Sequence, residues 1–331
     1  MNKTTIRDSL SKMGPFIALL LAGVFFTICS PFFLTTDNLM NIFRQSAVNA
    51  TICIGMLMVI LTGCIDLSVG AICALASCVM GVLMRDLGIE NPVILITSCV
   101  VTGVLCGLIN ALVYIKLRLP HPFIATLGTT QIFNGLALIV SHATPVTGFS
   151  QSVKFLGATR VFGIVPLCFL VILVLYVLVH IFLNNTVLGR EIYSVGGNIE
   201  AAKYSGINVS RVQFFVFIVC GTFCGVAAWI LTGRIGSAYP TTGATYATDA
   251  IAATIIGGAS FSGGKGNIWG TLMGVLLVQV LNNGLNLLGA STDIQNVVVG
   301  AVTIMAVFID VMRDKSSEKA KRAEMAKARG W

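Results

Sequence analysis

Residues 184 to 211 read NNTVLGREIYSVGGNIEAAKYSGINVSR, and this segment decides how the rest of the chain is interpreted. It is the longest polar stretch between two apolar runs that are each long enough to cross a membrane. Within it, Glu200, Ala201 and Ala202 are followed by Gly206. The pattern predicts two short helical turns with an acidic start and a break at the glycine. On a membrane protein, such a loop is a candidate docking surface for a soluble partner.

The composition of the chain is that of an integral membrane protein. Of its 331 residues, 56% are apolar and 10% are charged, and the mean hydropathy is +0.91. The net charge of +8 is explained by orientation in the membrane and contact with anionic lipid, so no nucleic-acid partner is expected. The ten cysteines lie within or beside apolar runs and form no Cys-x-x-Cys pair. We therefore expect neither a disulfide framework nor a metal site.

Apolar runs of membrane-crossing length predict an all-α bundle of about ten transmembrane helices. A crossing helix needs roughly twenty apolar residues. Runs of about that length lie at 16–34, 47–63, 67–84, 92–115, 122–140, 163–183, 212–231, 268–288 and 294–311. A shorter run at 250–260 makes the tenth span, and without it there are nine.

The basic residues decide between ten spans and nine. With ten spans and both termini in the cytoplasm, sixteen of the 21 Lys and Arg residues lie on the cytoplasmic side. Such an excess is the usual determinant of orientation. With nine spans, the basic C-terminus would move outside and the excess would collapse. The sequence thus predicts a transmembrane domain over 1–311, with a cytoplasmic loop at 184–211 and a basic tail at 312–331 near the inner leaflet.

Several kinds of chemistry are excluded by what the sequence lacks. The only Gly-Lys pair, Gly264-Lys265, has Ala259 where a P-loop requires its first glycine, so the chain is not expected to bind nucleotide in that way. The three histidines are scattered without a serine and carboxylate around them, so no hydrolytic site is predicted. Asp66 and Asp249 fall at span ends, which leaves few buried charges for an ion-coupled carrier.

Uncharged polar side chains occur inside the predicted spans. The richest group follows the i, i+3, i+4, i+7 spacing of one helix face, and it consists of Gln279, Asn282, Asn283 and Asn286. Asn49 and Asn134 add amides in two other spans. Buried amides must find partners, and bonding between helices is one interpretation. The other is that these groups line a path for a neutral polyhydroxylated solute.

Two segments predict interruptions between spans. Asp66 and Ser68 follow the second span, where they can accept hydrogen bonds from open N–H groups at the start of the next helix. That role as a cap and a role in gating both remain open. The second segment has two glycine pairs, Gly257-Gly258 and Gly263-Gly264, around a short polar turn. Glycine there permits a broken helix or a re-entrant hairpin shielded by neighbouring protein.

These motifs together resemble one family. The Glu-Ala-Ala-x-x-x-Gly pattern resembles the coupling loop by which permeases of bacterial ABC importers bind their ATPase. The segments 62–70, 257–266 and 281–286 are similar to those of the permease subunits for ribose, xylose, arabinose, galactose and autoinducer-2. The resemblance covers about residues 15–311, with the motifs in the family's order.

The resemblance implies a multi-pass permease of the bacterial cytoplasmic (inner) membrane that imports a small sugar and is not itself an enzyme. Its implied partners are ATPase subunits, which carry ATP and Mg, a second permease copy, and an extracytoplasmic sugar-binding protein. It assigns ATPase docking to Glu200, Ala201, Ala202 and Gly206. An ion-coupled secondary carrier and a passive channel are the alternative functions.

Overall fold

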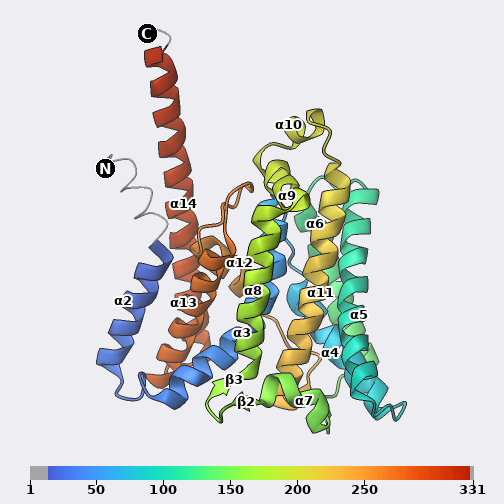
Figure 1. Cartoon of the computed structure of the whole chain (residues 1–331). Helices are drawn as coiled ribbons and strands as arrows, with labels where there is room; N and C mark the ends of the chain where they lie inside the picture. Colours follow the sequence, from blue (N-terminus) through green and yellow to red (C-terminus); the bar gives the residue numbers. More distant parts are fainter. Residues whose placement is uncertain (1–13, 329–331) are drawn as a thin grey trace.

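The computed structural model describes residues 14–328, and nearly all of its regular structure is helical (Figure 1). The helices are α2 (Gly14–Cys29), α3 (Thr36–Leu61), α4 (Val69–Arg85), α5 (Pro92–Ala111), the π-helical turn η1 (Leu112–Lys116), α6 (Pro122–Ser141), α7 (Gln151–Ala158), α8 (Leu167–Asn185), α9 (Val187–Gly197), α10 (Ile199–Tyr204), α11 (Val209–Ile235), α12 (Tyr246–Ile256), α13 (Ile268–Leu287) and α14 (Thr292–Ala328). Two ribbons of two-residue strands complete the fold. β1 (Val146–Thr147) pairs antiparallel with β4 (Ser237–Ala238), and β2 (Arg160–Val161) pairs with β3 (Val165–Pro166).

The structure confirms the predicted class of an all-α membrane protein. Six helices are long and apolar enough to cross a bilayer, namely α3, α5 with η1, α6, α8, α11 and α13. Four shorter apolar helices, α2, α4, α12 and the first part of α14, lie at the other predicted spans. At 1.5 Å per residue, α12 reaches only about 16 Å, against about 30 Å for a hydrocarbon core. The count of ten spans therefore stays a prediction.

Helix α3 is the buried centre of the bundle, and it begins eleven residues before the apolar run that predicted it. Every residue from 50 to 62 is buried. The first turns carry polar side chains, which interrupt the apolar run although the backbone there is helical. Two of them, Asn38 and Gln45, bond to amides on α13. Hydropathy alone places the helix start too late because paired amides satisfy these turns.

Glycines bring α5 and α11 into backbone contact, as their four-residue spacing predicts. A Cβ added at Gly103 would strike the carbonyl of Gly221, and one at Gly107 would strike the carbonyl of Phe217. Gly270 and Gly274 on α13 are also four residues apart and in close contact with α12, because a Cβ at Gly274 would meet the carbonyl of Ala253. The glycine pairs thus set the spacing between neighbouring helices.

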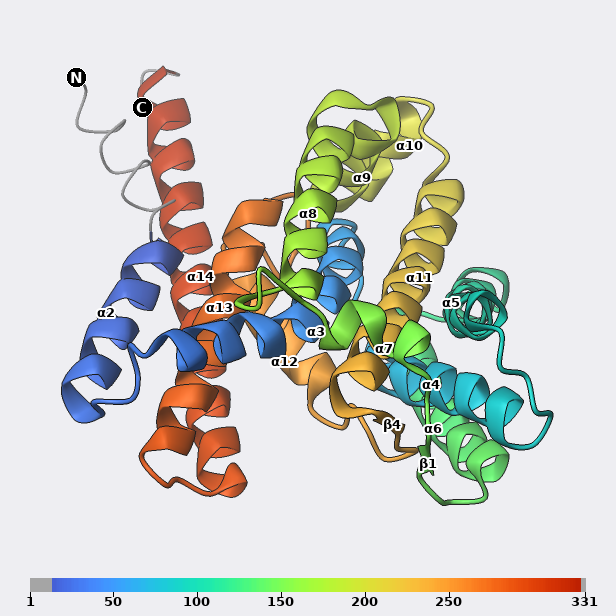
Figure 2. The ribbon, with the colours of Figure 1, turned by 60° about the horizontal axis from the view of Figure 1, so that its bottom comes forward.

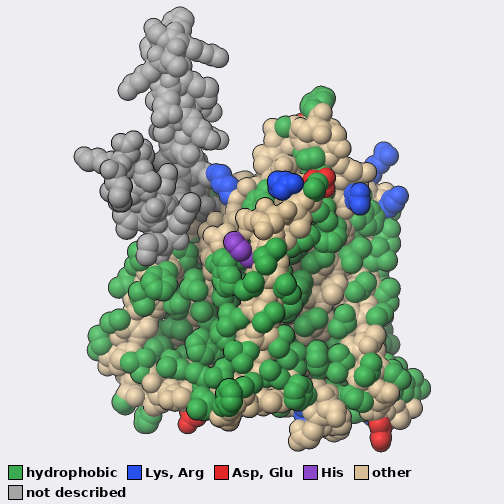
Figure 3. All heavy atoms as spheres, in the orientation of Figure 1, with side chains coloured by type: hydrophobic (Ala, Val, Ile, Leu, Met, Phe, Trp, Pro, Cys, Tyr) green, Lys and Arg blue, Asp and Glu red, His purple; other side chains and the backbone are tan. Residues whose placement is uncertain are grey.

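The molecule has two distinct ends. Figure 1 shows α9 and α10 at one end, and α7 with the β2–β3 ribbon at the other. In Figure 3, Lys and Arg side chains gather at the α9–α10 end, and hydrophobic side chains cover the flank between the ends. Figure 2 shows the β1–β4 ribbon beside α4 and α6. The segment 1–13 and the side chains of the basic tail beyond residue 312 lie outside the described residues.

We expect Gly221→Leu to destabilise the bundle, because a larger side chain would force α11 away from the carbonyl of Gly103. Such overpacking costs ~1–3 kcal/mol. The melting temperature of the purified protein in detergent should fall. Gly300→Leu on α14 is the matched control, since a Cβ at Gly300 has no neighbour within 4 Å among the described residues. Equal melting temperatures for the two variants would contradict this account.

Candidate functional site: a loop seated on two broken helices

The segment 184–211 folds as two short helices whose starts are capped by polar side chains. Thr186 Oγ1 accepts a hydrogen bond from the N–H of Gly189 at 3.0 Å, which starts α9. Asn198 Oδ1 accepts from the N–H of Ala201 at 3.0 Å and starts α10. Asn208 does the same for α11. Caps satisfy N–H groups that the helices cannot pair, so the loop is held by local bonds encoded in its own sequence.

The tip of this loop is α10 and the turn that ends it. Gly206 has a positive φ of 81°, and its N–H donates to the carbonyl of Lys203 at 2.9 Å. A left-handed residue at a helix end favours glycine, which explains the predicted break. Glu200, Ala201 and Gly206 are exposed, whereas Ala202 is only 3% exposed. Three of the four predicted docking residues therefore lie on the surface, and Ala202 packs beneath them.

Sequence reasoning missed the most prominent side chain of the tip. Tyr204 is 90% exposed at the end of α10, next to the turn at Gly206. An exposed aromatic side chain is unusual on a polar loop, and aromatic residues are enriched at protein interfaces. The available signal was the single aromatic residue between Ala202 and Gly206 in an otherwise small or polar turn.

Behind the tip, three segments meet through glycine backbones, and we call Gly63, Gly196, Gly197, Gly263 and Gly264 the glycine junction. The N–H of Gly264 donates to the carbonyl of Leu61 at 2.9 Å. A Cβ at Gly196 would collide with that same carbonyl, and one at Gly263 would lie 2.7 Å from the nitrogen of Gly63. The end of α9 thus rests directly on the segments that follow α3 and α12.

A tyrosine adds a side-chain bond to this contact. The hydroxyl of Tyr193 on α9 donates to the carbonyl of Gly266 at 3.0 Å. Burial raises the pKa of Tyr193 above its ordinary value, so the hydroxyl remains a donor even at alkaline pH where a free tyrosine begins to ionise. The predicted helix-break glycines 257–258 and 263–264 lie in the single hairpin that joins α12 to α13, where Gly258, Gly263 and Gly264 have positive φ. Helix α9 contacts the end of this hairpin through Tyr193.

The interruption between α3 and α4 is built around a buried carboxylate. Asp66 is fully buried, and its Oδ1 accepts hydrogen bonds from the N–H and the hydroxyl of Ser68 at 2.8 and 2.7 Å. Asn110 Nδ2 on α5 donates to Asp66 Oδ2 at 3.2 Å, and Thr129 on α6 donates to Asn110 Oδ1 at 2.6 Å. The Ser68 side chain makes no cap bond to α4, so of the predicted capping groups only Asp66 accepts a backbone N–H, that of Ser68. Asp66 also links the break to α5 and, through Asn110, to α6.

The predicted row of amides on α13 divides into two pairs. Gln279 Nε2 donates to Gln45 Oε1 at 2.9 Å, and Asn283 exchanges two hydrogen bonds with Asn38 at 2.9 and 3.0 Å. These two side chains are buried and join α13 to α3. Asn282 is half-buried and Asn286 is exposed. Bonding between helices therefore explains half of the row.

Of the two remaining predicted amides, Asn49 lies on α3 and Asn134 lies on α6. Asn49 has a buried Oδ1 that accepts no hydrogen bond within the described part of the chain. Asn134 is half-buried and lines a cavity of about 320 Å³. The walls of this cavity come from α4, α6 and the segment before α12, and they are Leu67, Gly70, Ala71, Thr130, Asn134, Leu138, Pro240, Thr241, Thr242, Gly243, Ala244 and Ala247.

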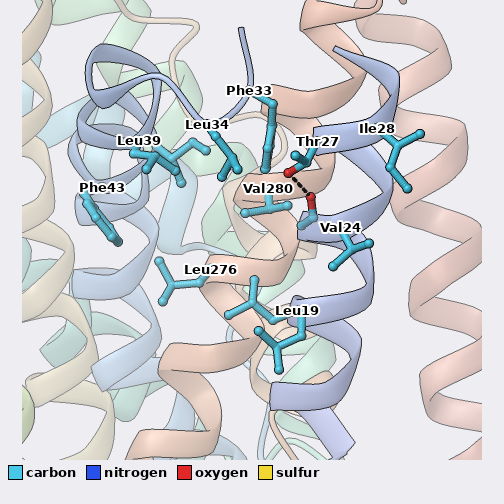
Figure 4. Close-up of a pocket in the computed structure, with 13 residues that line it drawn as sticks. Leu19, Val24, Thr27, Ile28, Phe33, Leu34, Leu39, Phe43, Leu276 and Val280 are labelled. Carbon is cyan, nitrogen blue, oxygen red and sulfur yellow. Dashed lines mark hydrogen bonds between the residues drawn. The ribbon is translucent and has the colours of Figure 1, made fainter. Parts of the chain in front are cut away.

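A larger hollow of about 470 Å³ lies between α2, α3 and α13 (Figure 4). Its walls are apolar side chains such as Leu19, Phe33 and Val280. The hydroxyl of Thr27 is already donated to the carbonyl of Gly23 at 2.7 Å, as the dashed line in Figure 4 marks. Such walls suit hydrocarbon, whereas a sugar would lose hydrogen bonds there. The smaller, polar cavity is the better candidate for a solute.

Comparison with known protein families matches residues 38–307 to the family described as branched-chain amino acid transport system / permease component. The chain belongs to this family. The match covers α3 to α13 and most of the apolar part of α14, so it includes the loop, both helix breaks and the polar cavity. The family's members are multi-pass membrane proteins, in agreement with the six helices here that are long and apolar enough to cross a bilayer.

Several relatives of this chain are sugar import permeases. The chain is 42% identical to the ribose import permease protein RbsC of Bacillus subtilis (strain 168), over 93% of this chain and 94% of that protein. It is 41% identical to the D-allose transport system permease protein AlsC of Escherichia coli (strain K12), over 92% and 93%. The fructose import permease protein FrcC of Rhizobium meliloti is 36% identical over 89% and 84%. No solved structure matches. These relatives confirm the predicted resemblance.

We expect Gly196→Ala to loosen the glycine junction, because a methyl group there has no room beside the carbonyl of Leu61. Trypsin should then cut faster after Arg190 or Lys203, both of which are exposed in the loop. Gly197→Ala is the matched control, since a Cβ at the next residue of α9 has no described neighbour within 4 Å. Equal cleavage rates in the two variants would show that the contact does not hold the loop.

Proposed function

We propose that this chain is the membrane subunit of an ATP-driven importer for a small neutral sugar. The observation that carries the proposal is the seating of the α9–α10 loop on both broken segments through the glycine junction. Because backbone touches backbone there, a displacement of the loop is passed on without slack from flexible side chains. An ATPase bound to the tip would thus act on the segments before α4 and after α12.

The proposed orientation puts the α9–α10 end in the cytoplasm. Arg190, Lys203 and Arg211 lie in the loop, and Figure 3 shows basic side chains gathered at this end. An excess of Lys and Arg on the cytoplasmic side is the usual signature of orientation. The opposite end, with α7 and the short ribbons, then faces the sugar-binding protein, and ten spans place both termini inside.

The ATPase partners would dock on Glu200, Ala201 and Gly206, with Tyr204 as an additional contact. ATP and Mg are bound by those partners, so this chain makes and breaks no covalent bond. When the ATPases close, the loops of two permease copies would be drawn together, and the broken helices would open the path on one side and close it on the other. A homodimer and a heterodimer of close relatives both satisfy this scheme.

The chemistry of the interior favours a sugar over an amino acid as the solute. The amides on α13 and the lining of the polar cavity are uncharged. A zwitterionic amino acid would need charged or strongly polar partners for its carboxylate and its ammonium group. A sugar offers hydroxyl groups, which amides and threonines can both donate to and accept from. The printed names of the relatives include ribose, D-allose and fructose.

The alternatives, an ion-coupled carrier and a passive channel, need no ATPase. The buried Asp66 gives the carrier hypothesis one ionisable group that hydropathy does not reveal. However, Asp66 is occupied by Ser68 and Asn110, and it links helices at the break. The carrier hypothesis also leaves the solvent-exposed tip of α10 without a function, so the importer is favoured.

The proposed docking predicts the outcome of Gly206→Arg. Arginine would be strained at a φ of 81° and would place a bulky cation on the tip, so uptake and co-purification of the ATPase should both be lost. Gly206→Asn is the matched control, because asparagine tolerates the left-handed conformation and should keep most activity. Uptake of radiolabelled ribose, allose, fructose and galactose by reconstituted complexes measures the effect. Normal uptake by Gly206→Arg would count against the docking.

The amide pair between α13 and α3 generates a second prediction. Asn283→Leu leaves Asn38 Oδ1 without its donor, while Asn38 Nδ2 keeps its bond to the carbonyl of Phe33. This loss should cost about 1 kcal/mol of stability and slow uptake while ATPase binding is kept. The double variant Asn38→Leu/Asn283→Leu removes both amides and should regain the melting temperature but not the rate of uptake. Full recovery of uptake in the double variant would assign the pair to helix packing alone.

A further inference from the structure

We propose that the polar cavity between α4, α6 and the segment 240–247 is the place where the sugar pauses inside the permease. Thr241, Thr242 and Asn134 would hold it by its hydroxyl groups. This inference rests on the proposed function, and it adds a binding site at a stated depth with named contacts.

The depth of the cavity follows from the length of α12 and from the contact of α12's preceding segment with α4. Helix α12 has 11 residues, and it ends beside the hairpin of the glycine junction at the α9–α10 end. Its first turn therefore lies about 16 Å below that end, near the middle of a hydrocarbon core of about 30 Å. Helix α4 begins at the same depth, because Gly70 in its first turn touches Gly243 just before α12. A Cβ at Gly243 would lie 2.9 Å from Cα of Gly70.

The chain around the start of α4 thus contacts the chain on both sides of α12, at two places. One contact is at the glycine junction through Gly63 and Gly263, and the other is at mid-depth through Gly70 and Gly243. The polar cavity opens beside the second contact, and Gly70 and Gly243 are part of its wall. Irregular backbone at membrane depth is tolerated where it lines a cavity, and solute sites of other transporters are built at such broken helices.

The polar groups of the cavity have capacity for a ligand. The side chains of Asn134, Thr241 and Thr242 make no hydrogen bond to any residue in the part of the chain that the structure describes. Thr130 donates to the carbonyl of Thr126 at 2.6 Å and can still accept. Polar groups at membrane depth need partners, which water or a solute must then supply. By contrast, the amides on α13 that face α3 are already paired.

The lining also selects the class of ligand. It contains no charged side chain, and its polar groups are hydroxyls and one amide that both donate and accept. A volume of about 320 Å³ is at the lower end of the range for ligand pockets. The site therefore fits a neutral polyol the size of a monosaccharide. Four polar side chains among apolar walls give weak binding, as a transit site requires for release.

The test compares two double variants in complexes reconstituted with the ATPase and the sugar-binding protein. Thr241→Val/Thr242→Val removes both uncommitted hydroxyls from the cavity. Thr102→Val/Thr222→Val is the matched control, because those hydroxyls donate to carbonyls of their own helices at 2.8 and 2.7 Å and line no part of the cavity. We expect the sugar moved per ATP hydrolysed to fall about fivefold or more in the first variant only.

Two further variants keep the test decisive. Thr241→Ser/Thr242→Ser retains both hydroxyls and should transport like the wild type. Ala244→Phe fills the cavity without removing a polar group and should block sugar movement while ATP hydrolysis continues, and it carries the test if the valine variant fails to assemble. The inference is overturned if the valine and phenylalanine variants keep the wild-type ratio, or if the serine variant loses as much as the valine variant.

Failure of the proposed importer function and failure of the proposed sugar site give different results. If wild-type complexes take up none of the four sugars with ATP, the proposed function is wrong. If the wild type transports and the cavity variants transport equally well, only the site is wrong. If sugar movement and ATP hydrolysis fall by the same factor in Thr241→Val/Thr242→Val, the cavity acts in coupling and does not hold the solute.

Discussion

The contact on which the rest of the structure depends is the approach of three backbones at the glycine junction. Any side chain at Gly196 or Gly263 would separate α9 from the ends of α3 and α12. With glycine there, the polar loop and both helix interruptions are in direct backbone contact. The hydrogen bond from Gly264 to Leu61 and that from Tyr193 to Gly266 fix the geometry of this contact. The exposed tip of the loop is thereby joined by backbone contacts to the segments that precede α4 and follow α12.

The polar groups inside the bundle fall into two sets, one that bonds helices together and one that lines the polar cavity. Asp66, Ser68, Asn110 and Thr129 are fully paired with one another, and they hold the start of α4 against α5 and α6. The hydroxyls of Thr241 and Thr242 and the amide of Asn134 line the polar cavity beside the same helix, without a partner in the described part of the chain. Paired groups in an apolar bundle specify packing, and unpaired ones need a ligand or water. Some polar groups of the interior therefore serve helix packing, and the others are available to a ligand or water.

The sequence predicts the helices well and the contacts between them only in part. Apolar runs locate each long helix, and the Glu200 to Gly206 pattern locates the tip, because both signals are local. The start of α3 is misplaced because its polar turns are satisfied by residues 245 positions away, as with Asn38 and Asn283. The same limit hides Thr241 and Thr242, which the fold brings beside Asn134. Burial of Asp66 likewise depends on helices that a local pattern cannot place.

The β1–β4 ribbon has a mechanical consequence. Val146 pairs with Ala238, which fastens the chain just before residues 240–247 to the connection that follows α6. Val146 also lies against α4, since a Cβ at Gly81 would sit 2.9 Å from its side chain. One end of the segment leading into α12 is thus tethered, and the other end of α12 leads into the hairpin that contacts the loop. In the proposed importer, a push at the tip would therefore tilt α12 about this tethered end and move the wall of the polar cavity.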